Sequence, residues 1–320
     1  MFVGASVGFH FKNKNTMDAN LQKLHNQLMI QKSFEQFKPK KIFPAVLGIL
    51  FLAVILVWTA VFYHSDSKLR VKFLDVGQGD SIFIKTPKNQ KILIDGGPDS
   101  TVLEKLGENL PFYDRTLDLV ILTHPHADHL VGLIYVLERY NVKMVAFTGA
   151  THTTDEYLEW LNLIKKKKIP VKIVYSGVNF DFGDDCKLIT LYPFSSLENE
   201  RVDSLNNSSI VCKLVYKNNS FLLSGDIEEE AEKEILDQKV DIKADVLKVA
   251  HQGSKTSSSE DFLKAVDSRV AVIMVGEENK FGHPHKQVLE SLEALGINFL
   301  RTDKNGDIEF VSDGEKIYLK

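Results

Sequence analysis

Three runs of apolar residues that predict buried strands lead directly into side chains of the kinds that bind metal ions. The run 117–123 is followed by His124-Pro125-His126-Ala127-Asp128-His129, the run 220–223 by Ser224-Gly225-Asp226, and the run 244–250 by His251-Gln252-Gly253-Ser254. Alternate residues that leave a strand end can point to a common centre. The pattern therefore predicts a fold in which several strand ends meet at one place.

The first of these segments carries the most specific signal. His124 and His126 are spaced to share one ion, while Asp128 and His129, at the start of the next predicted helix, can reach a second ion beside it. Imidazole and carboxylate ligands suit zinc, manganese or iron. A surface histidine cluster without function is the alternative, but such a cluster contributes nothing to a hydrophobic core. The aspartate and histidine at the two later strand ends would complete a two-metal site.

From residue 69 onward the chain alternates between predicted strands and helices. Turns rich in glycine and proline separate the short runs 69–76, 81–86 and 91–95. Further strands are expected at 117–123, 142–147, 187–191, 210–216, 220–223, 244–250 and 270–275, and near Phe299, Ile308 and Ile317. Helices are expected at 130–140, 155–168, 228–238, 258–266 and 285–295. The predicted strands and helices fall into two halves in which they follow a similar order. This repetition predicts two packed sheets with helices outside, in one α/β domain over residues 69–320.

The run Ile42–Tyr63 holds no charged side chain and predicts one transmembrane helix at residues 42–64. At about 1.5 Å per residue, 22 residues span about 33 Å, enough for a hydrocarbon core of about 30 Å. A buried core helix is the alternative, but such helices rarely stay apolar on every face for this long. Lysines are more frequent before the run than after it. This bias predicts a cytoplasmic tail at residues 1–41 and an extracytoplasmic C-terminal domain at the cell membrane.

Charge and cysteine content exclude several classes of protein. The formal charge is +5 over residues 1–41 and −9 over residues 65–320, so the charge gives no support to a broadly basic protein that coats nucleic acid. Two cysteines, Cys186 and Cys212, cannot form a disulfide framework or a cysteine-rich zinc site. They form one disulfide or remain two buried thiols. Residues 17–37 could form a helix, although we expect an unstructured tail there.

The motifs in this order resemble those of the metallo-β-lactamase superfamily over residues 69–320. More narrowly, the chain resembles the extracytoplasmic metallo-β-lactamase domain of the ComEC family of competence proteins. The segments that carry the narrower resemblance are 73–81 (FLDVGQGDS), 94–97 (IDGG), 123–129 (THPHADH), 206–209 (NNSS), 223–228 (LSGDIE), 247–254 (LKVAHQGS) and 281–285 (FGHPH). The resemblance implies a four-layer αββα sandwich and a metal-dependent hydrolase. For the competence proteins it implies DNA as the substrate.

The resemblance also implies two divalent ions, zinc or manganese, bridged by one carboxylate. The ligands carried over position by position are His124, His126 and Asp226 for the first ion, and Asp128, His129, Asp226 and His251 for the second. The first site is the weaker one, because the segment 206–209 stands where the superfamily usually has a further histidine. Gln252 stands where the competence branch repeats histidine. We interpret this change as tolerable, because His251 fills the ligand position.

Several other side chains are candidates for catalysis or support. Asp128, beside a metal-activated water, could orient that water or accept its proton. His283 and His285 are expected to grip a substrate oxygen or to protonate the leaving group, although a helix-entry turn with exposed imidazoles is the alternative. Three lysines flank the motifs and could contact phosphates: Lys248, Lys255 and Lys280. Asp95 is expected to hold the loops of the site in place. Gly77 and Gly79 are expected to form a tight turn.

We therefore expect a membrane-anchored, metal-dependent hydrolase that acts on phosphodiesters, most plausibly DNA. With one predicted span, the chain would need a separate membrane channel protein as a partner in DNA uptake. Two alternatives remain open: an amide, lactone or thioester hydrolase on the same metals, and a metal-stabilised binding module without catalysis. The histidines and lysines near the motifs favour phosphate, while the negative charge of the domain counts against long polyanions.

Overall fold

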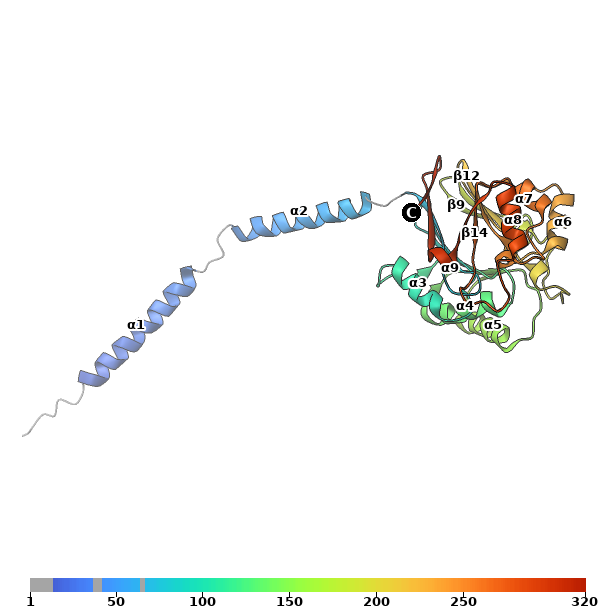
Figure 1. Ribbon diagram of the computed structural model, residues 1–320. Helices are drawn as coiled ribbons and strands as arrows, with labels where there is room; N and C mark the ends of the chain where they lie inside the picture. The colour runs from blue at the N-terminus through green and yellow to red at the C-terminus, as the bar shows by residue number, and fades with distance from the viewer. Residues whose placement is uncertain (1–13, 37–41, 64–66) are drawn as a thin grey trace, which may run out of the picture. The chain divides into compact units, whose positions relative to one another are not determined.

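A computed structural model describes residues 14–36, 42–63 and 67–320 of the chain (Figure 1). The chain divides into an N-terminal unit of residues 1–65 and a C-terminal unit of residues 66–320. Every described strand lies in the C-terminal unit.

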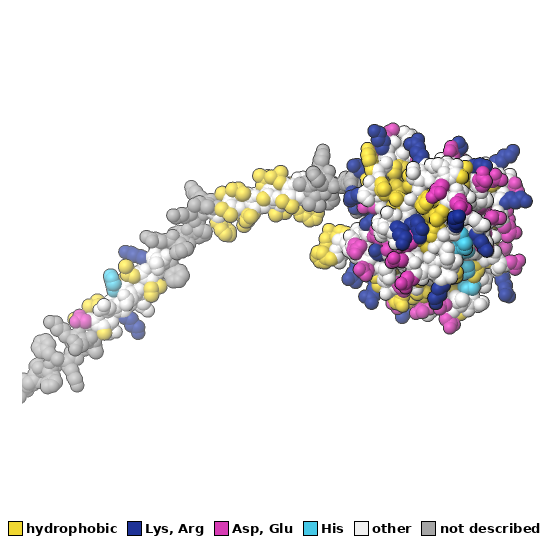
Figure 2. All heavy atoms as spheres, viewed as in Figure 1, with side chains coloured by type: hydrophobic (Ala, Val, Ile, Leu, Met, Phe, Trp, Pro, Cys, Tyr) yellow, Lys and Arg dark blue, Asp and Glu magenta, His cyan; other side chains and the backbone are white. Residues whose placement is uncertain are grey.

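Two helices make up the described part of the N-terminal unit, α1 (Lys14–Gln36) and α2 (Ile42–Tyr63). The helix α1 occupies a region where we expected an unstructured tail. The helix α2 coincides with the uncharged run, and its large apolar side chains are exposed along the helix (Figure 2). Within the described ranges, no helix combines the length and the hydropathy needed to cross a bilayer, so the membrane span expected at residues 42–64 is not shown.

Two large sheets form the centre of the C-terminal unit. The first has the strand order β17-β16-β1-β2-β3-β5-β7-β8, and the second has the order β15-β14-β13-β12-β11-β10-β9. The strands of the first sheet are β1 (Leu69–Phe73), β2 (Ile82–Lys85), β3 (Lys91–Ile94), β5 (Leu119–Ile121), β7 (Val145–Phe147), β8 (Val171–Ile173), β16 (Ile308–Ser312) and β17 (Ile317–Leu319). Those of the second are β9 (Phe180–Gly183), β10 (Cys186–Tyr192), β11 (Val211–Tyr216), β12 (Asn219–Leu223), β13 (Val246–Lys248), β14 (Val270–Ile273) and β15 (Asn298–Arg301). A small separate pair consists of β4 (Thr116–Leu117) and β6 (Asn141–Val142).

Helices cover the outer face of each sheet, as Figure 1 shows. The first sheet is covered by α3 (Thr101–Asn109), α4 (Ala127–Arg139) and α5 (Asp155–Lys167), and the second by α6 (Glu229–Asp237), α7 (Glu260–Val266) and α8 (Lys286–Ala294). A short helix α9 (Thr302–Asn305) follows β15, and two 3₁₀ turns, η1 (Asn206–Ser208) and η2 (Ala250–Gly253), lie in loops. The layers therefore run helix, sheet, sheet, helix, as the resemblance implied.

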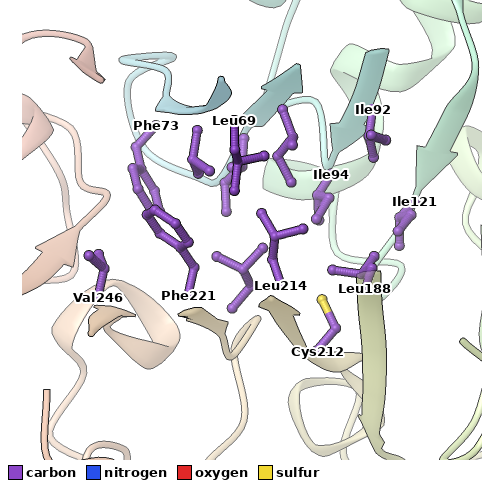
Figure 3. Close-up of a cluster of buried hydrophobic side chains, with 14 of the residues drawn as sticks. Leu69, Phe73, Ile92, Ile94, Ile121, Leu188, Cys212, Leu214, Phe221 and Val246 are labelled. Atoms are coloured by element: carbon purple, nitrogen blue, oxygen red, sulfur yellow. The ribbon is translucent and has the colours of Figure 1, made fainter. Parts of the chain in front are cut away.

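The alternating side chains of the strands explain why the two sheets pack face to face. In β1 the residues Leu69, Val71 and Phe73 are buried, whereas the residues between them are only partly buried. They meet side chains of the second sheet such as Leu214 and Phe221 in the core between the sheets (Figure 3). Full burial of such a side chain contributes about 1.5–3 kcal/mol, so this core holds the two halves together.

Cys186 and Cys212 lie on the neighbouring strands β10 and β11 and are free, buried thiols. The strand register pairs Cys186 with Tyr216 and Cys212 with Thr190, so the two thiols are not opposite each other. Of the two alternatives left open by the sequence, the structure has two buried thiols.

Candidate metal centre

The segment after β5 presents two imidazole nitrogens to each other. Thr123 donates its hydroxyl hydrogen to Asp95 Oδ2 (2.7 Å), so its oxygen accepts from His124 Nδ1–H (3.1 Å). The lone pair of His124 Nε2 is thereby directed at His126 Nδ1, 3.0 Å away. Burial lowers the pKa of both imidazoles, that of His124 well below its usual value. Both rings are thus neutral, as metal ligands must be.

Asp226 and His129 bring a carboxylate and a third imidazole to the same place. Asp226 follows β12 through Gly225, which has a φ of +53°. His129, buried near the start of α4, has its Nε2 3.2 Å from Asp226 Oδ2 and 3.8 Å from Asp128 Oδ2. Candidate ligand atoms of His124, His129 and Asp226 all lie within 4.8 Å of one another. The strand ends after β5 and β12 therefore converge.

The buried carboxylate of Asp95 orients His129 from behind. Asp95, at the end of β3, accepts hydrogen bonds from Thr123 N (2.8 Å) and from His129 Nδ1 (2.8 Å). Such a bond fixes the tautomer of a metal-binding histidine and raises the basicity of its other nitrogen. Asp95 thus supports the site without facing the proposed ion, in keeping with the role expected for it.

Lys248 is an internal cation and not a contact for phosphates. It is completely buried at the end of β13, and its Nζ donates to Gly225 O (2.7 Å), Asp226 Oδ1 (3.1 Å) and Asp80 Oδ2. These bonds use all three ammonium hydrogens, so none is left for a substrate. Burial opposes the charge on Lys248, but the Asp80 and Asp226 carboxylates outweigh it and raise its pKa.

Charge coupling inside the cluster sets the protonation of its carboxylates. Burial would raise the pKa of Asp226, but His129 and Lys248 hold it well below its usual value. Burial raises the pKa of Asp80 to about 7, and its Oδ1 has no hydrogen-bond partner. The carboxylates of Asp226, Asp128 and Asp95 overcome the burial of His129 and raise its pKa. A divalent ion at these ligands would displace the proton from His129.

Gln252, and not His251, lies against the carboxylates of the centre. Gln252 Nε2 donates to Asp128 Oδ2 (2.9 Å) and to Asp226 Oδ2 (3.3 Å). His251 is partly exposed, with its Nδ1 3.4 Å from Glu228 Oε1 and 3.5 Å from Asn206 Nδ2. The strand β13 ends at Lys248, and both residues then adopt left-handed backbone angles, φ 48° and 53°, in η2. This turn directs the side chain of Gln252, instead of that of His251, toward the ligands.

The loop after β1 fixes the orientation of the Gln252 amide. Gly276 N donates to Gln78 Oε1 (3.1 Å), so the Gln78 amide nitrogen is free to donate to Gln252 Oε1. The hydrogens of the Gln252 amide therefore face the carboxylates. In the same loop Gly79 has a φ of +134°, and a Cβ there would lie 2.1 Å from the carbonyl oxygen of Asp128. Glycine is required for this close approach to the start of α4.

The segment 206–209 supports the end of β12 and brings no imidazole to the centre. Asn207 Oδ1 accepts from Glu228 N (2.8 Å), and Ser209 Oγ accepts from Asp226 N (3.1 Å). Side-chain caps of this kind hold the backbone of Asp226 in place. The first ion position therefore lacks the further histidine, as the sequence predicts.

His251, His283 and His285 form a group beside the ligands, which we call the histidine rim. The ring centroids of His251 and His283 are 5.5 Å apart, and those of His283 and His285 are 5.0 Å apart. Burial lowers the pKa of His283 to about 4, and its Nδ1 has no hydrogen-bond partner. His285 Nδ1 accepts from Lys255 N (3.2 Å), which leaves the proton of a neutral ring on Nε2.

The donor set fits a divalent ion at the first position. The facing nitrogens of His124 and His126 and the carboxylate of Asp226 are donors that zinc, manganese and iron accept. Around the second position Asp128 and Asp226 also converge, but the amide hydrogens of Gln252 point at both carboxylates. The side chains therefore support divalent-metal binding at the centre.

Sequence reasoning missed three members of this arrangement: Asp80, Lys248 as an internal cation, and Gln252. A signal for Lys248 was present, because a lysine inside an apolar strand is almost never buried without a carboxylate partner. The loop 77–80, with two glycines and an aspartate after a strand, was the matching signal for Asp80.

Comparison with known proteins identifies the family of the chain. Residues 74–277 match the sequence profile of the metallo-beta-lactamase superfamily. The chain is 34% identical over 264 residues to ComE operon protein 3 of Bacillus subtilis, which covers 77% of this chain and 33% of that protein. It is 29% identical over 278 residues to competence protein ComA of Neisseria gonorrhoeae, which covers 83% of this chain and 36% of that protein. The chain thus spans about a third of the length of these relatives.

A solved structure supports the fold. The metallo-beta-lactamase fold protein YhfI of Bacillus subtilis aligns with a TM-score of 0.50 at 13% identity, over 77% of this chain and 100% of that protein. The four layers are therefore those of a known architecture, and the resemblance to competence proteins is confirmed by the sequence matches.

Proposed function

The chain belongs to the metallo-β-lactamase superfamily, and we propose that its C-terminal unit is a metal-dependent phosphodiesterase that acts on DNA. The observation that carries the proposal is the facing pair of His124 Nε2 and His126 Nδ1, 3.0 Å apart, with the buried carboxylate of Asp226 within 4.8 Å of a ligand nitrogen of His124. The similarity to a competence protein supports nucleic acid as the substrate.

In this proposal His124, His126 and Asp226 hold the ion. When bound, a divalent ion acts as a Lewis acid on a phosphoryl oxygen and makes water a nucleophile at neutral pH. Asp128, whose side chain is 32% exposed, is the carboxylate placed to orient that water or to accept its proton. His129 and Lys248 together hold the pKa of Asp226 well below its usual value, so that this carboxylate remains ionised and available as a ligand.

The histidine rim has the chemistry to bind a phosphate oxygen. The backbone N–H of Lys255 fixes the proton of His285 on Nε2, which makes that nitrogen a hydrogen-bond donor. His283, with its pKa lowered to about 4 by burial, is neutral at neutral pH and is suited to orient the substrate. His285 is therefore the better candidate to donate a hydrogen bond to a phosphate oxygen or to the leaving-group oxygen. Lys255 and Lys280 are exposed and available to phosphates.

One observation favours a second candidate, a metal-stabilised binding module without catalysis. The amide of Gln252 stands among the carboxylates where a catalytic centre would carry a ligand. A centre with fewer ligands could hold an ion that stabilises the fold and still bind nucleic acid.

We also propose that α2 attaches the chain to the cell membrane, with the C-terminal unit outside the cytoplasm. The helix has no charged residue over 22 positions, and its large apolar side chains are exposed. The excess of lysines before it favours a cytoplasmic N-terminus. A separate channel protein would then pass DNA through the membrane.

A substrate panel tests the activity. The full chain, purified in detergent, would be supplied with Mn²⁺ or Zn²⁺ and offered single-stranded DNA, bis-p-nitrophenyl phosphate and nitrocefin. We expect cleavage of the two phosphodiesters, no cleavage of nitrocefin, and loss of activity with chelator. Turnover of nitrocefin alone would contradict the proposal, and retained metal with no turnover would favour the binding module.

A further inference from the structure

The structure assigns to this centre a single divalent ion, because the side chain of Gln252 takes the place of a second one. The inference rests on the metal-binding part of the proposed function. It concerns the number of ions, which can be counted without any measurement of hydrolysis.

The first step is the direction of the Gln252 amide. Its Nε2 is 2.9 Å from Asp128 Oδ2 and 3.3 Å from Asp226 Oδ2. An amide nitrogen carries two hydrogens and has no lone pair for a metal. Its two N–H groups therefore satisfy the oxygens that a second ion would require.

The second step is that this direction is fixed. The backbone N–H of Gly276 holds Gln78 Oε1, and the Gln78 amide nitrogen then donates to Gln252 Oε1. A flip of the Gln252 amide would set two amide nitrogens against each other. The oxygen of Gln252 is thus kept away from the ligand cluster.

The third step is the fixed positive charge of Lys248. Its ammonium group is 3.1 Å from Asp226 Oδ1, while Asp226 Oδ2 faces His129 and Gln252. Both oxygens of the expected bridging carboxylate therefore already have donors. His251, the ligand expected for a second ion, contacts Glu228 and Asn206 instead.

At the first position the imidazole nitrogens contact each other and not a fixed amide or ammonium group. His124 Nε2 and His126 Nδ1 face each other 3.0 Å apart, and no hydrogen-bond donor from Gln252 or Lys248 reaches either nitrogen among the contacts of the described residues. Transfer of the His126 proton from Nδ1 to Nε2 frees both facing nitrogens for one ion beside Asp226.

Metal counting on matched variants tests the inference. The full chain would be loaded with Zn²⁺ or Mn²⁺, desalted, and counted by native mass spectrometry and elemental analysis. We expect one ion in the wild type and two in Gln252→His. Gln252→Glu, which keeps the shape of glutamine, is also expected to hold two. His251→Gln, the control at the neighbouring residue, should still hold one.

The outcomes separate this inference from the proposed function. Two ions in the wild type, or a loss of the ion in His251→Gln, would overturn the single-ion assignment even if DNA is hydrolysed. One ion in both Gln252 variants, with native circular dichroism spectra, would overturn it as well. One ion in the wild type, two in the Gln252 variants and no hydrolysis would uphold it and reject the phosphodiesterase.

Discussion

At the scale of single residues, the electrostatics of the centre depend on Lys248. Its ammonium group balances Asp80 and Asp226, two carboxylates that are themselves almost fully buried. Burial of an ion pair is costly, and removal of one partner leaves the other charge without compensation. The same lysine therefore influences the stability of the fold and the charge of a proposed metal ligand.

Lys248→Met should strongly destabilise the protein. It leaves Asp80 and Asp226 without their cation, and we expect a loss of about 3–5 kcal/mol in the free energy of unfolding. Chemical denaturation of the metal-loaded chain measures this loss. Lys264→Met, which removes an exposed partner of Glu260, is the control and should cause no measurable change. Equal stability of the two variants would show that the buried ion pairs of Lys248 do not contribute this free energy.

His283 should make the fold sensitive to acid. Its folded-state pKa is about 4, below the usual 6.5, because the ring is buried. Below pH 6.5 the unfolded chain binds a proton that the folded chain does not, so stability falls until the pH nears 4. His283→Gln should remove about 1–3 kcal/mol of that decline. The free energy of unfolding, measured across this pH range with chelator present, checks the prediction. Identical pH dependence in the wild type and in His283→Gln would show that His283 does not cause the decline.

At the scale of elements, the sequence predicted most central strands and helices but not the ends that shape the site. The strands near 91–95 and 220–223 were predicted because apolar runs between turns are a strong signal. The edge strands β8 and β9 were missed because their side chains are largely exposed or only partly buried and show little pattern. The helix α3 was missed as well, since it buries only Val102 and Leu106.

The roles of His251 and Gln252 show why a strand end is hard to place from sequence. The apolar pattern predicts a strand through residue 250, and His251 would then point to the ligands. In the structure β13 ends at Lys248 and a left-handed turn follows. That turn has contacts with distant segments, such as the hydrogen bond from His285 N to Gly253 O (2.9 Å), which local sequence does not reveal.

A pair of glycine variants tests how the loop after β1 positions α4. In Gly79→Ala the new Cβ would meet the carbonyl oxygen of Asp128 at 2.1 Å, so the loop or the start of α4 must move. We expect weaker metal binding and a stability loss of about 2–4 kcal/mol. Gly77→Ala, with φ +79° and no atom within 4 Å, should cost about 1 kcal/mol and leave metal affinity unchanged. Calorimetry measures the metal affinity of the two variants, and thermal melting measures their stability. Equal affinity and equal stability in both variants would contradict this prediction.

At the scale of the whole molecule, the chain joins an apolar N-terminal helix to an acidic domain with a candidate metal centre. On the face drawn in Figure 2, basic and acidic side chains are interspersed over the C-terminal unit. A long polyanion would find no continuous basic surface on that face. The proposed binding of DNA therefore relies on the centre itself, with the ion and the histidine rim as the contacts, and not on a basic track across this face.

The proposed membrane attachment predicts which part of the chain a protease can reach. In spheroplasts of a bacterial host that expresses the full chain, added protease should digest the C-terminal unit and spare the N-terminal tail. Deletion of residues 42–63 should release the protein from the membrane fraction. A C-terminal unit protected in intact spheroplasts would reverse the orientation, and an intact chain in the soluble fraction would refute attachment.

The central claim is that the cluster at the strand ends is a metal centre that hydrolyses phosphodiesters, and Asp226→Ala tests it most directly. This change removes the carboxylate that lies within 4.8 Å of His124 and His129, and it leaves Lys248 with only Asp80 and the carbonyl oxygen of Gly225 as partners. The measurement is the rate of metal-dependent cleavage of single-stranded DNA, with metal content and folding determined on the same samples. We expect a loss of at least about 10³-fold together with loss of the ion, whereas His285→Ala should lower the rate and keep the ion. Full activity in a folded Asp226→Ala variant would contradict the account.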